Sequence, residues 1–243
     1  MCRGQRMRFE CASRTHVGLK RKINEDSLFA DPERGLWVVA DGMGGHEAGE
    51  VASGMVIDAL RTLPLLDDLD ELATSASEAL QRVNRDLIGL ARSGGGGQTI
   101  GTTVVGLAIA NGSFRCFWLG DSRAYRFRDG MITRISHDHS LVQNLVDAGM
   151  IKPEEAESHE NANLITRAVG VSEKVAVDVV SGDALEGDQF LLASDGLTRV
   201  VSDEELALTL ARTSPEEAAD NLLSKVLERG APDNVSLIIA RLV

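Results

Sequence analysis

A short apolar run leads directly into an acid and three glycines at Trp37-Val38-Val39-Ala40-Asp41-Gly42-Met43-Gly44-Gly45-His46. Four apolar residues are too few for a helix, so residues 37–40 are predicted to form a buried strand. Asp41 then stands at the end of that strand, and Gly42 allows the backbone to approach a ligand closely. A lone Asp-Gly pair is more often a tight turn with a solvated carboxylate, and this alternative stays open on these residues alone.

Four further aspartates occupy similar positions, at the ends of predicted strands or in loops: Asp26, Asp121, Asp195 and Asp233. Taken singly, such residues are more often turn residues or helix caps. Mg²⁺ and Mn²⁺ prefer carboxylate, carbonyl and water ligands, so a site for such ions needs several acids from separate loops. Five acids in equivalent positions therefore predict a divalent-metal site, to which the Gly42 carbonyl adds a neutral ligand.

The composition is that of an ordinary folded protein and excludes several classes of partner. The chain has 243 residues, 43% of them hydrophobic, and suits one large domain or two small ones. Its formal net charge of −12 disfavours nucleic acid or an anionic membrane as the main partner and suits a site that holds cations. No apolar run approaches 18 residues, and the N-terminus has no signal-type apolar core, so we expect a cytoplasmic protein.

The cysteines point to neither disulfides nor zinc. Cys2, Cys11 and Cys116 cannot all pair and lack ligand-type spacing, and Cys116 is predicted to lie in the core. Cys2 and Arg8 match the Cys-x5-Arg spacing of cysteine-dependent phosphatases, but that motif requires a preceding strand. We attribute the match to chance, and Met7 is an alternative natural start.

Apolar periodicity and turn residues divide the chain into short strands and helices. The predicted strands are residues 9–15, 27–30, 37–40, 99–110, 113–119, 123–128, 131–135, 175–180, 188–193 and 235–240. The predicted helices are residues 47–63, 69–91, 138–148, 202–211 and 215–228. Residues 152–168 are polar and weakly patterned, which indicates a mobile insertion.

The order of these elements predicts an α+β fold. Turn dipeptides at Asn111-Gly112 and Asp129-Gly130 space the central strands as an antiparallel meander. Helices and strands come in runs and do not alternate, so antiparallel sheets covered by helix pairs are expected in place of a doubly wound fold.

Arg21 is the basic residue with a possible role in chemistry. A guanidinium near a metal cluster can grip phosphate oxygens in a bidentate manner. The alternative is a solvated basic run with Lys20 and Lys22, which composition alone favours.

Six motifs in order resemble the metal-dependent serine/threonine protein phosphatases of type 2C, in their compact bacterial form. They are Arg21-Lys22-Ile23-Asn24-Glu25-Asp26, Val39-Ala40-Asp41-Gly42-Met43-Gly44-Gly45-His46, Gly101-Thr102-Thr103, Gly120-Asp121-Ser122-Arg123, Ser194-Asp195-Gly196-Leu197 and Asp233-Asn234. The resemblance implies a four-layer α/β/β/α sandwich with a flap insertion. It places a single catalytic domain at residues 9–243, the flap at about 138–169 and an N-terminal extension at 1–8.

The resemblance also assigns roles to the acids. Asp41 would bridge two Mn²⁺ or Mg²⁺ ions, with the Gly42 carbonyl on one of them. Asp195 and Asp233 would bind the first ion, and Asp26 would serve the second. Asp121 would help to hold a weaker third ion, and Arg21 would bind the substrate phosphate. A water between the two ions would attack phosphorus directly.

The general acid is a departure from the family pattern. In many eukaryotic members a histidine directly follows the Asp-Gly pair, whereas Met43 stands there in this chain. His46 is the candidate replacement for a catalytic role, and the alternative is that it caps or packs at the start of the following helix.

The implied function is hydrolysis of phosphoserine and phosphothreonine on proteins, in opposition to a Ser/Thr kinase in bacterial signalling. The expected partners are that kinase and its substrates, the expected state is a monomer, and neither nucleic acid nor membrane is expected. The alternative is a catalytically weak phosphoprotein-binding or sensing module of the same fold. A two-metal nuclease shares the carboxylate logic but needs a basic surface, which the charge disfavours.

Overall fold

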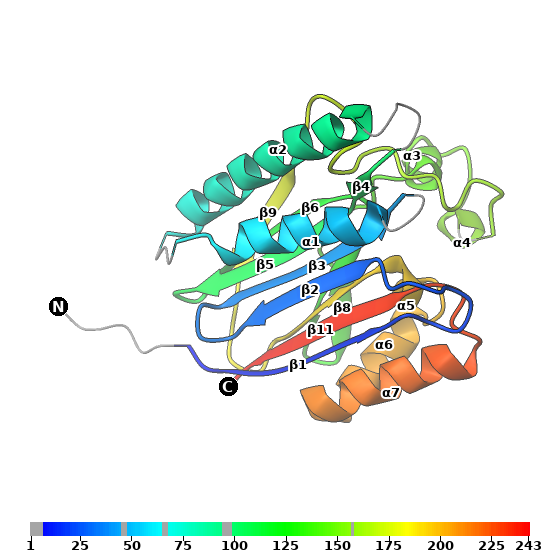
Figure 1. The fold of residues 1–243 in the computed structure, drawn as a ribbon. Coiled ribbons are helices and arrows are strands. Elements are labelled where there is room, and N and C mark those ends of the chain that lie inside the picture. The colour runs from blue at the N-terminus through cyan, green and yellow to red at the C-terminus, as the bar shows by residue number, and fades with distance from the viewer. Residues whose placement is uncertain (1–6, 45–47, 65–67, 94–98, 157) are drawn as a thin grey trace.

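Two antiparallel sheets pack face to face and are covered by helices on their outer sides (Figure 1). The computed structural model describes residues 7–44, 48–64, 68–93, 99–156 and 158–243, so Cys2 and His46 lie outside the described residues. This arrangement confirms the predicted α+β sandwich. No helix among the described residues is long and apolar enough to cross a bilayer.

The strands of the two sheets come from both ends of the chain. The first sheet has the order β1 (Phe9–His16), β11 (Val235–Leu242), β10 (Gln189–Ala193), β7 (Arg123–Arg128) and β8 (Met131–Arg134). The second has the order β2 (Asp26–Asp31), β3 (Leu36–Met43), β5 (Val104–Ala110), β6 (Ser113–Leu119) and β9 (Asp178–Asp183), with β4 (Gly101–Thr102) paired to β3.

The apolar run 36–40 of β3 is buried on both faces, which explains why it is continuously apolar. Leu36, Val38 and Ala40 of β3 pack toward the helices that cover the second sheet. Trp37 and Val39 point the other way, into the core between the two sheets. Side chains of a strand alternate between faces, so a strand between two apolar layers has no position for a polar residue.

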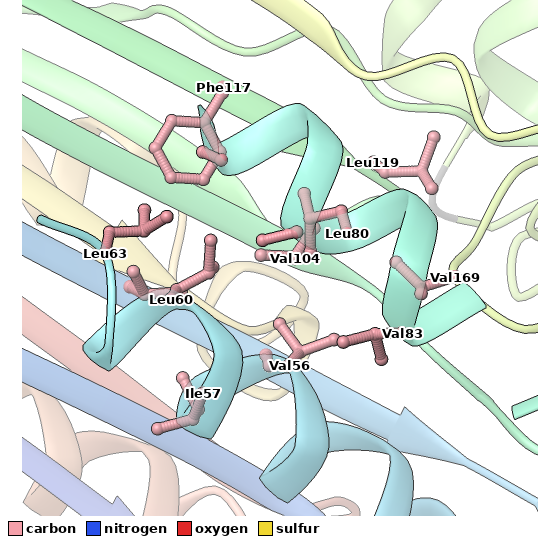
Figure 2. Packing of buried hydrophobic residues seen from close by; sticks show 14 of the residues in the cluster. Val56, Ile57, Leu60, Leu63, Leu80, Val83, Val104, Phe117, Leu119 and Val169 are labelled. Atoms are coloured by element: carbon pink, nitrogen blue, oxygen red, sulfur yellow. The ribbon is translucent and has the colours of Figure 1, made fainter. Parts of the chain in front are cut away.

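Two long helices cover the second sheet, α1 (Ala48–Arg61) and α2 (Leu69–Ser93). Figure 2 shows Val56 and Leu60 of α1, Leu80 of α2, and Val104 and Phe117 of the sheet in one buried cluster. The apolar positions recur at helical spacing, so both helices bury one face against the strands.

The first sheet is covered by α6 (Asp203–Leu210) and α7 (Pro215–Glu228). The side chains of Ser202 and Ser214 each accept a hydrogen bond from the backbone N–H of the glutamate three residues later. The carboxylate of that glutamate accepts a hydrogen bond from the backbone N–H of the serine. These capping boxes satisfy N–H groups that the first turn leaves free, so both helix starts are locally encoded.

The predicted single meander is wrong. The hairpins β5–β6 and β7–β8 form as expected, but β6 belongs to the second sheet and β7 to the first. The chain crosses between sheets at Gly120, whose φ of 119° is one that residues with a side chain rarely adopt. Turn residues specify each hairpin but not the sheet it joins, and the crossing carries Asp121 to the place where the sheets meet.

Several element boundaries also differ from prediction. The expected strand 99–110 is interrupted at Thr103, and the expected strand 175–180 is found three residues later as β9. The insertion holds two short helices, α3 (Leu141–Asp147) and α4 (Pro153–Ala156). A one-turn helix, α5 (Asp195–Thr198), was not predicted, because four residues carry no periodicity.

Candidate active site

Asp41 lies inside β3 and not at its end. It pairs with Asp26 of β2 across the sheet, and β4 extends the pairing to Gly42 and Met43. The Asp41 carbonyl accepts hydrogen bonds from the Thr103 amide at 2.8 Å and the Thr102 hydroxyl at 2.9 Å. The predicted strand was therefore too short, and the main chain that carries Asp41 is held on both sides.

Gly42 is required by packing against the protein itself. A Cβ at this position would overlap the Gly49 carbonyl oxygen and would lie 2.5 Å from the Glu25 carbonyl oxygen. The Gly42 amide donates to that Glu25 carbonyl at 3.1 Å. The close approach described here is to backbone at the start of α1 and before β2, and the approach of Gly42 to a ligand stays a prediction.

Glu25 links three parts of the site and was not predicted as a functional residue. Its carboxylate accepts from the Gly49 amide at 3.1 Å, and its carbonyl accepts from the Ser53 hydroxyl at 2.6 Å. Its amide donates to the Asn234 side chain at 2.9 Å, next to Asp233. Glu25 therefore positions Asp26, Gly42 and Asp233 relative to one another.

Two of the predicted acids are buried with one oxygen unpartnered. Asp26 is 7% exposed and accepts the Ser194 hydroxyl at 2.8 Å on Oδ2, while its Oδ1 has no hydrogen-bond partner. Asp121 is 5% exposed and accepts Arg199 Nη2 at 3.1 Å on Oδ2, while its Oδ1 also lacks a partner. A buried carboxylate oxygen without a partner is costly, which is the pattern expected where a cation would bind.

Two arginines pair with the remaining acids. Arg199 Nε lies 3.0 Å from Asp195 Oδ2, so Arg199 joins Asp195 to Asp121. Arg21 Nη2 donates to Asp233 Oδ2 at 2.8 Å. Arg199 was missed by sequence reasoning, because its relation to Asp195 depends on the unpredicted turn of α5.

The five aspartates share one electrostatic environment. Burial raises the pKa of Asp26 to about 7 and that of Asp121 to about 7. Burial also raises the pKa of Asp41 well above its ordinary value, and the negative charges of the other four acids raise it further. The acids predicted from separate loops therefore converge around Asp41.

The donor set fits a hard divalent cation. It consists of carboxylates and backbone carbonyls, which Mg²⁺ and Mn²⁺ prefer over nitrogen or sulfur, and it includes the two unpartnered oxygens. Across the described ranges, no three His, Cys, Asp or Glu side chains meet closely enough to form a preformed metal site. Asp195 and Asp121 instead pair with Arg199, and Asp233 pairs with Arg21.

The raised pKa values predict how metal-free protein responds to pH. The pKa of Asp26 is about 7 when folded, against about 3.9 in an unfolded chain. A raised carboxyl pKa means that folding becomes less favourable as pH rises through this window, and the full penalty applies above pH 7. We expect Asp26→Asn to raise the Tm of chelator-treated protein by about 4 °C or more at pH 8.

Scanning calorimetry or fluorimetry at several pH values measures this effect. At pH 4 the variant and the wild type should melt within about 2 °C of each other, since the carboxyl is then protonated in the folded state and about half protonated in the unfolded chain. An equal Tm difference at pH 4 and pH 8 would contradict the electrostatic origin.

The match to known proteins agrees with this geometry. The family described as Protein phosphatase 2C matches residues 15–229. The chain belongs to this family. The serine/threonine protein phosphatase PstP of Mycobacterium tuberculosis is 39% identical over 232 residues, which cover 96% of this chain and 45% of that protein. The serine/threonine phosphatase stp of Listeria innocua is 34% identical, with 93% of each chain covered.

Solved structures of the phosphatase 2C family share the fold. PppA of Pseudomonas aeruginosa superposes with a TM-score of 0.90 at 40% identity, covering 97% of this chain and 98% of its own. The catalytic domain of PstP in complex with two manganese ions gives 0.86 at 37% identity, covering 98% and 99%. The resemblance inferred from the six motifs is confirmed: this is a phosphatase 2C domain of the metal-dependent serine/threonine class. It spans about half the length of PstP.

Proposed function

We propose that this chain hydrolyses phosphoserine and phosphothreonine on proteins, by direct attack of water on phosphorus and with Mn²⁺ or Mg²⁺ as cofactor. The observation that carries the proposal is the convergence of five carboxylates around Asp41, two of them with a buried, unpartnered oxygen. Such a cluster is electrostatically unfavourable by itself and favourable once divalent cations enter it.

The residues that would hold the ions are those at the centre of this cluster. Asp41 would contact two ions, with the Gly42 carbonyl on one of them, and Asp195 and Asp233 would complete the first position. Asp26 would serve the second, and Asp121 a third. Bound ions would supply positive charge that stabilises the phosphate oxygens and lowers the pKa of water in the site.

The protein's own groups position the reactants. Thr102 and Thr103 hold the Asp41 main chain, and Ser194 orients the Asp26 carboxylate. Met43, which follows Asp-Gly, has no proton to give to the departing alkoxide. A general-acid role for His46 stays a prediction, because that residue lies outside the described part of the chain.

The exposure and contacts of Arg21 support a role in binding the substrate phosphate. Its side chain is 53% exposed and contacts Asp233 through one nitrogen. A guanidinium carries five N–H donors, so the pair with Asp233 leaves donors for phosphate oxygens.

We expect Arg21→Ala to lower kcat/KM on phosphopeptides by about ten- to a hundredfold. This range corresponds to the loss of one charge-assisted hydrogen-bonded pair, which contributes roughly 1.5–3 kcal/mol. Steady-state phosphate release measures it. Lys20→Ala, which removes a neighbouring exposed cation, is the matched control. If both substitutions lowered kcat/KM equally, Arg21 would be only a solvated member of the basic run with Lys20 and Lys22.

We further propose that residues 9–243 form one catalytic domain in which 138–169 act as a flap and 1–8 as an extension. A cavity of about 490 Å³ supports the flap assignment. Val142 and Val146 of α3 and Pro153 of α4 line one side of it, and Asp121 and Asp195 line the other. Material bound in this cavity would contact the insertion and the acid cluster together.

Shortening the flap separates substrate recognition from chemistry. Replacement of residues 152–161 by a short glycine-serine linker keeps the hydrogen bond between Leu141 and Leu164 at the base of the flap. We expect rates on phosphoproteins to fall about tenfold more than rates on a small aryl phosphate, since selecting loops act mainly on large substrates. Equal losses on both substrates, with the circular dichroism unchanged, would contradict a selective flap.

Phosphate release from phosphoserine and phosphothreonine peptides in Mn²⁺ tests the function itself. Turnover supports the enzyme, whereas saturable peptide binding without release would favour the alternative of a sensing module. We propose cytoplasmic phosphoproteins and the Ser/Thr kinase that modifies them as partners, and a monomer as the acting form.

A further inference from the structure

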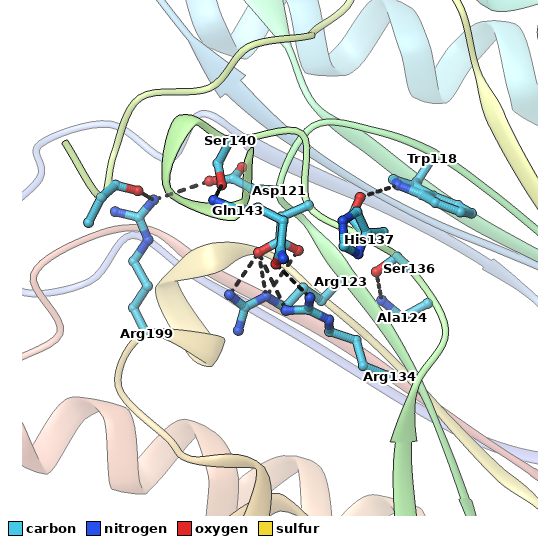
Figure 3. Close-up of polar contacts among 12 residues, drawn as sticks. Trp118, Asp121, Arg123, Ala124, Arg134, Ser136, His137, Ser140, Gln143 and Arg199 are labelled. Atoms are coloured by element: carbon cyan, nitrogen blue, oxygen red, sulfur yellow. Dashed lines mark hydrogen bonds and ion pairs between the residues drawn. The ribbon is translucent and has the colours of Figure 1, made fainter. Parts of the chain in front are cut away.

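Arg199 joins the acid cluster to the flap. It follows α5, and its amide donates to the Asp195 carbonyl at 2.9 Å, which places the two side chains one turn apart. Nε lies 3.0 Å from Asp195 Oδ2, and Nη2 lies 3.1 Å from Asp121 Oδ2. Nη2 also donates to the Ala162 carbonyl at 3.3 Å, and Figure 3 shows the side chain reaching from α5 toward Asp121.

The turn that carries Arg199 is fixed by packing. A Cβ on Gly196 would overlap the carbonyl oxygen of Asn234, so α5 sits directly against the segment that contains Asp233. Leu197 and Thr198 are buried. The backbone of Arg199 therefore has a set position, while its side chain, 30% exposed, borders the cavity under the flap and has room to move.

The charges around Arg199 define what it does there. Two carboxylates, one of them almost fully buried, face a single guanidinium. A divalent cation between Asp121 and Asp195 would meet that guanidinium as a like charge a few ångströms away. The two cations therefore compete for the same oxygen atoms.

We propose that Arg199 is a resident cation that occupies the position between Asp121 and Asp195. A third divalent ion binds there only when the guanidinium swings out, and that movement gives up the contact with Ala162 and loosens the flap. The inference rests on the proposed function, because it takes the other ions to be held around Asp41. Arg199 thereby controls whether a third ion occupies this position.

Metal binding without turnover tests this directly. Mn²⁺ bound per chain is measured by equilibrium dialysis for the wild type, Arg199→Gln and Arg199→Lys, with Arg212→Gln as a control that removes an exposed arginine at the end of α6. We expect Arg199→Gln to bind the third ion at least about tenfold more tightly than the wild type or the control, since a like charge beside the site is gone. Arg199→Lys keeps the positive charge but lacks the planar, forked guanidinium, so its affinity for the third ion should lie between those of the wild type and Arg199→Gln.

A second substitution locates the extra ion. Asp121→Asn in the Arg199→Gln background should remove the third ion and leave the tighter ions in place. Equal third-ion affinity in wild type and Arg199→Gln would overturn the proposal while leaving the proposed function intact. Absence of the tighter ions from every variant would instead overturn the proposed function, and this inference with it.

Hydrogen exchange at the flap gives an independent readout. The amides of Leu164 and Thr166 are hydrogen-bonded within and at the base of the flap. In metal-free Arg199→Gln their exchange should be at least about threefold faster than in Arg212→Gln, because local opening no longer breaks an Arg199 contact. Unchanged exchange in a variant that binds the third ion would overturn the link to the flap.

Discussion

Asp41→Asn is expected to lower kcat/KM on phosphoserine peptides by about a thousandfold or more. Asp41 is the acid around which the other four gather, and removal of one preorganised electrostatic group commonly costs a hundred- to a thousandfold. Because Asp41 would contact two ions at once, we expect its substitution to lower kcat/KM by at least the upper end of that range. Initial rates of phosphate release at saturating Mn²⁺ measure the loss.

The fold should survive this substitution. The hydrogen bonds that hold residue 41 to Thr102 and Thr103 use its main chain and not its carboxylate. Asp58→Asn, which removes an exposed carboxylate from α1, is the matched control and should retain full activity. If Asp41→Asn kept an activity within tenfold of the control, the assignment of Asp41 as the central ligand would be wrong.

Removal of divalent metal should abolish turnover and lower stability together. Without cations, the buried carboxylates of Asp26 and Asp121 have only partial compensation from Ser194 and Arg199. A ligand at a hundred times its Kd stabilises the folded state by about 2.7 kcal/mol. For a domain of this size that corresponds to a rise in Tm of roughly 5–10 °C.

Activity and Tm measured across a Mn²⁺ titration of chelator-treated protein test this prediction. Chelator already saturated with Ca²⁺ controls for effects of the chelator itself, and restored Mn²⁺ should recover both quantities. Full activity in excess free chelator would contradict the metal-dependent mechanism.

The sequence predicted the elements of this fold where local signals are strong. The run 37–40 was predicted as a strand and lies in β3 between two apolar layers, and the helices predicted at 202–211 and 215–228 begin at the capping boxes of Ser202 and Ser214. The same analysis missed α5 and placed Asp41 at a strand end, since four-residue turns and short added strands such as β4 carry little local signal.

The chemical type of the site was also encoded locally. Five aspartates at predicted strand ends or in loops indicate oxygen ligands for a hard cation, and the burial of Asp26 and Asp121 and their electrostatic coupling to Asp41 agree with that prediction. Arg21 contacts Asp233, one of these acids, and its role in binding phosphate stays a prediction. Arg199 was not selected, because it becomes informative only when a turn of helix brings it beside Asp195.

By itself, the sequence determined most of the helices and strands, the hairpins β5–β6 and β7–β8, and the oxygen-rich nature of the site, because each depends on residues within a few positions of one another. Only the tertiary structure decided which sheet each hairpin joins, which atoms require Gly42 and which acids lose their hydration. These properties arise from pairs far apart in the chain, such as Asp26 with Ser194 or Arg21 with Asp233. The burial and the electrostatic coupling of a residue depend on many such pairs. The local periodicity of the sequence contains no information about which of these pairs form.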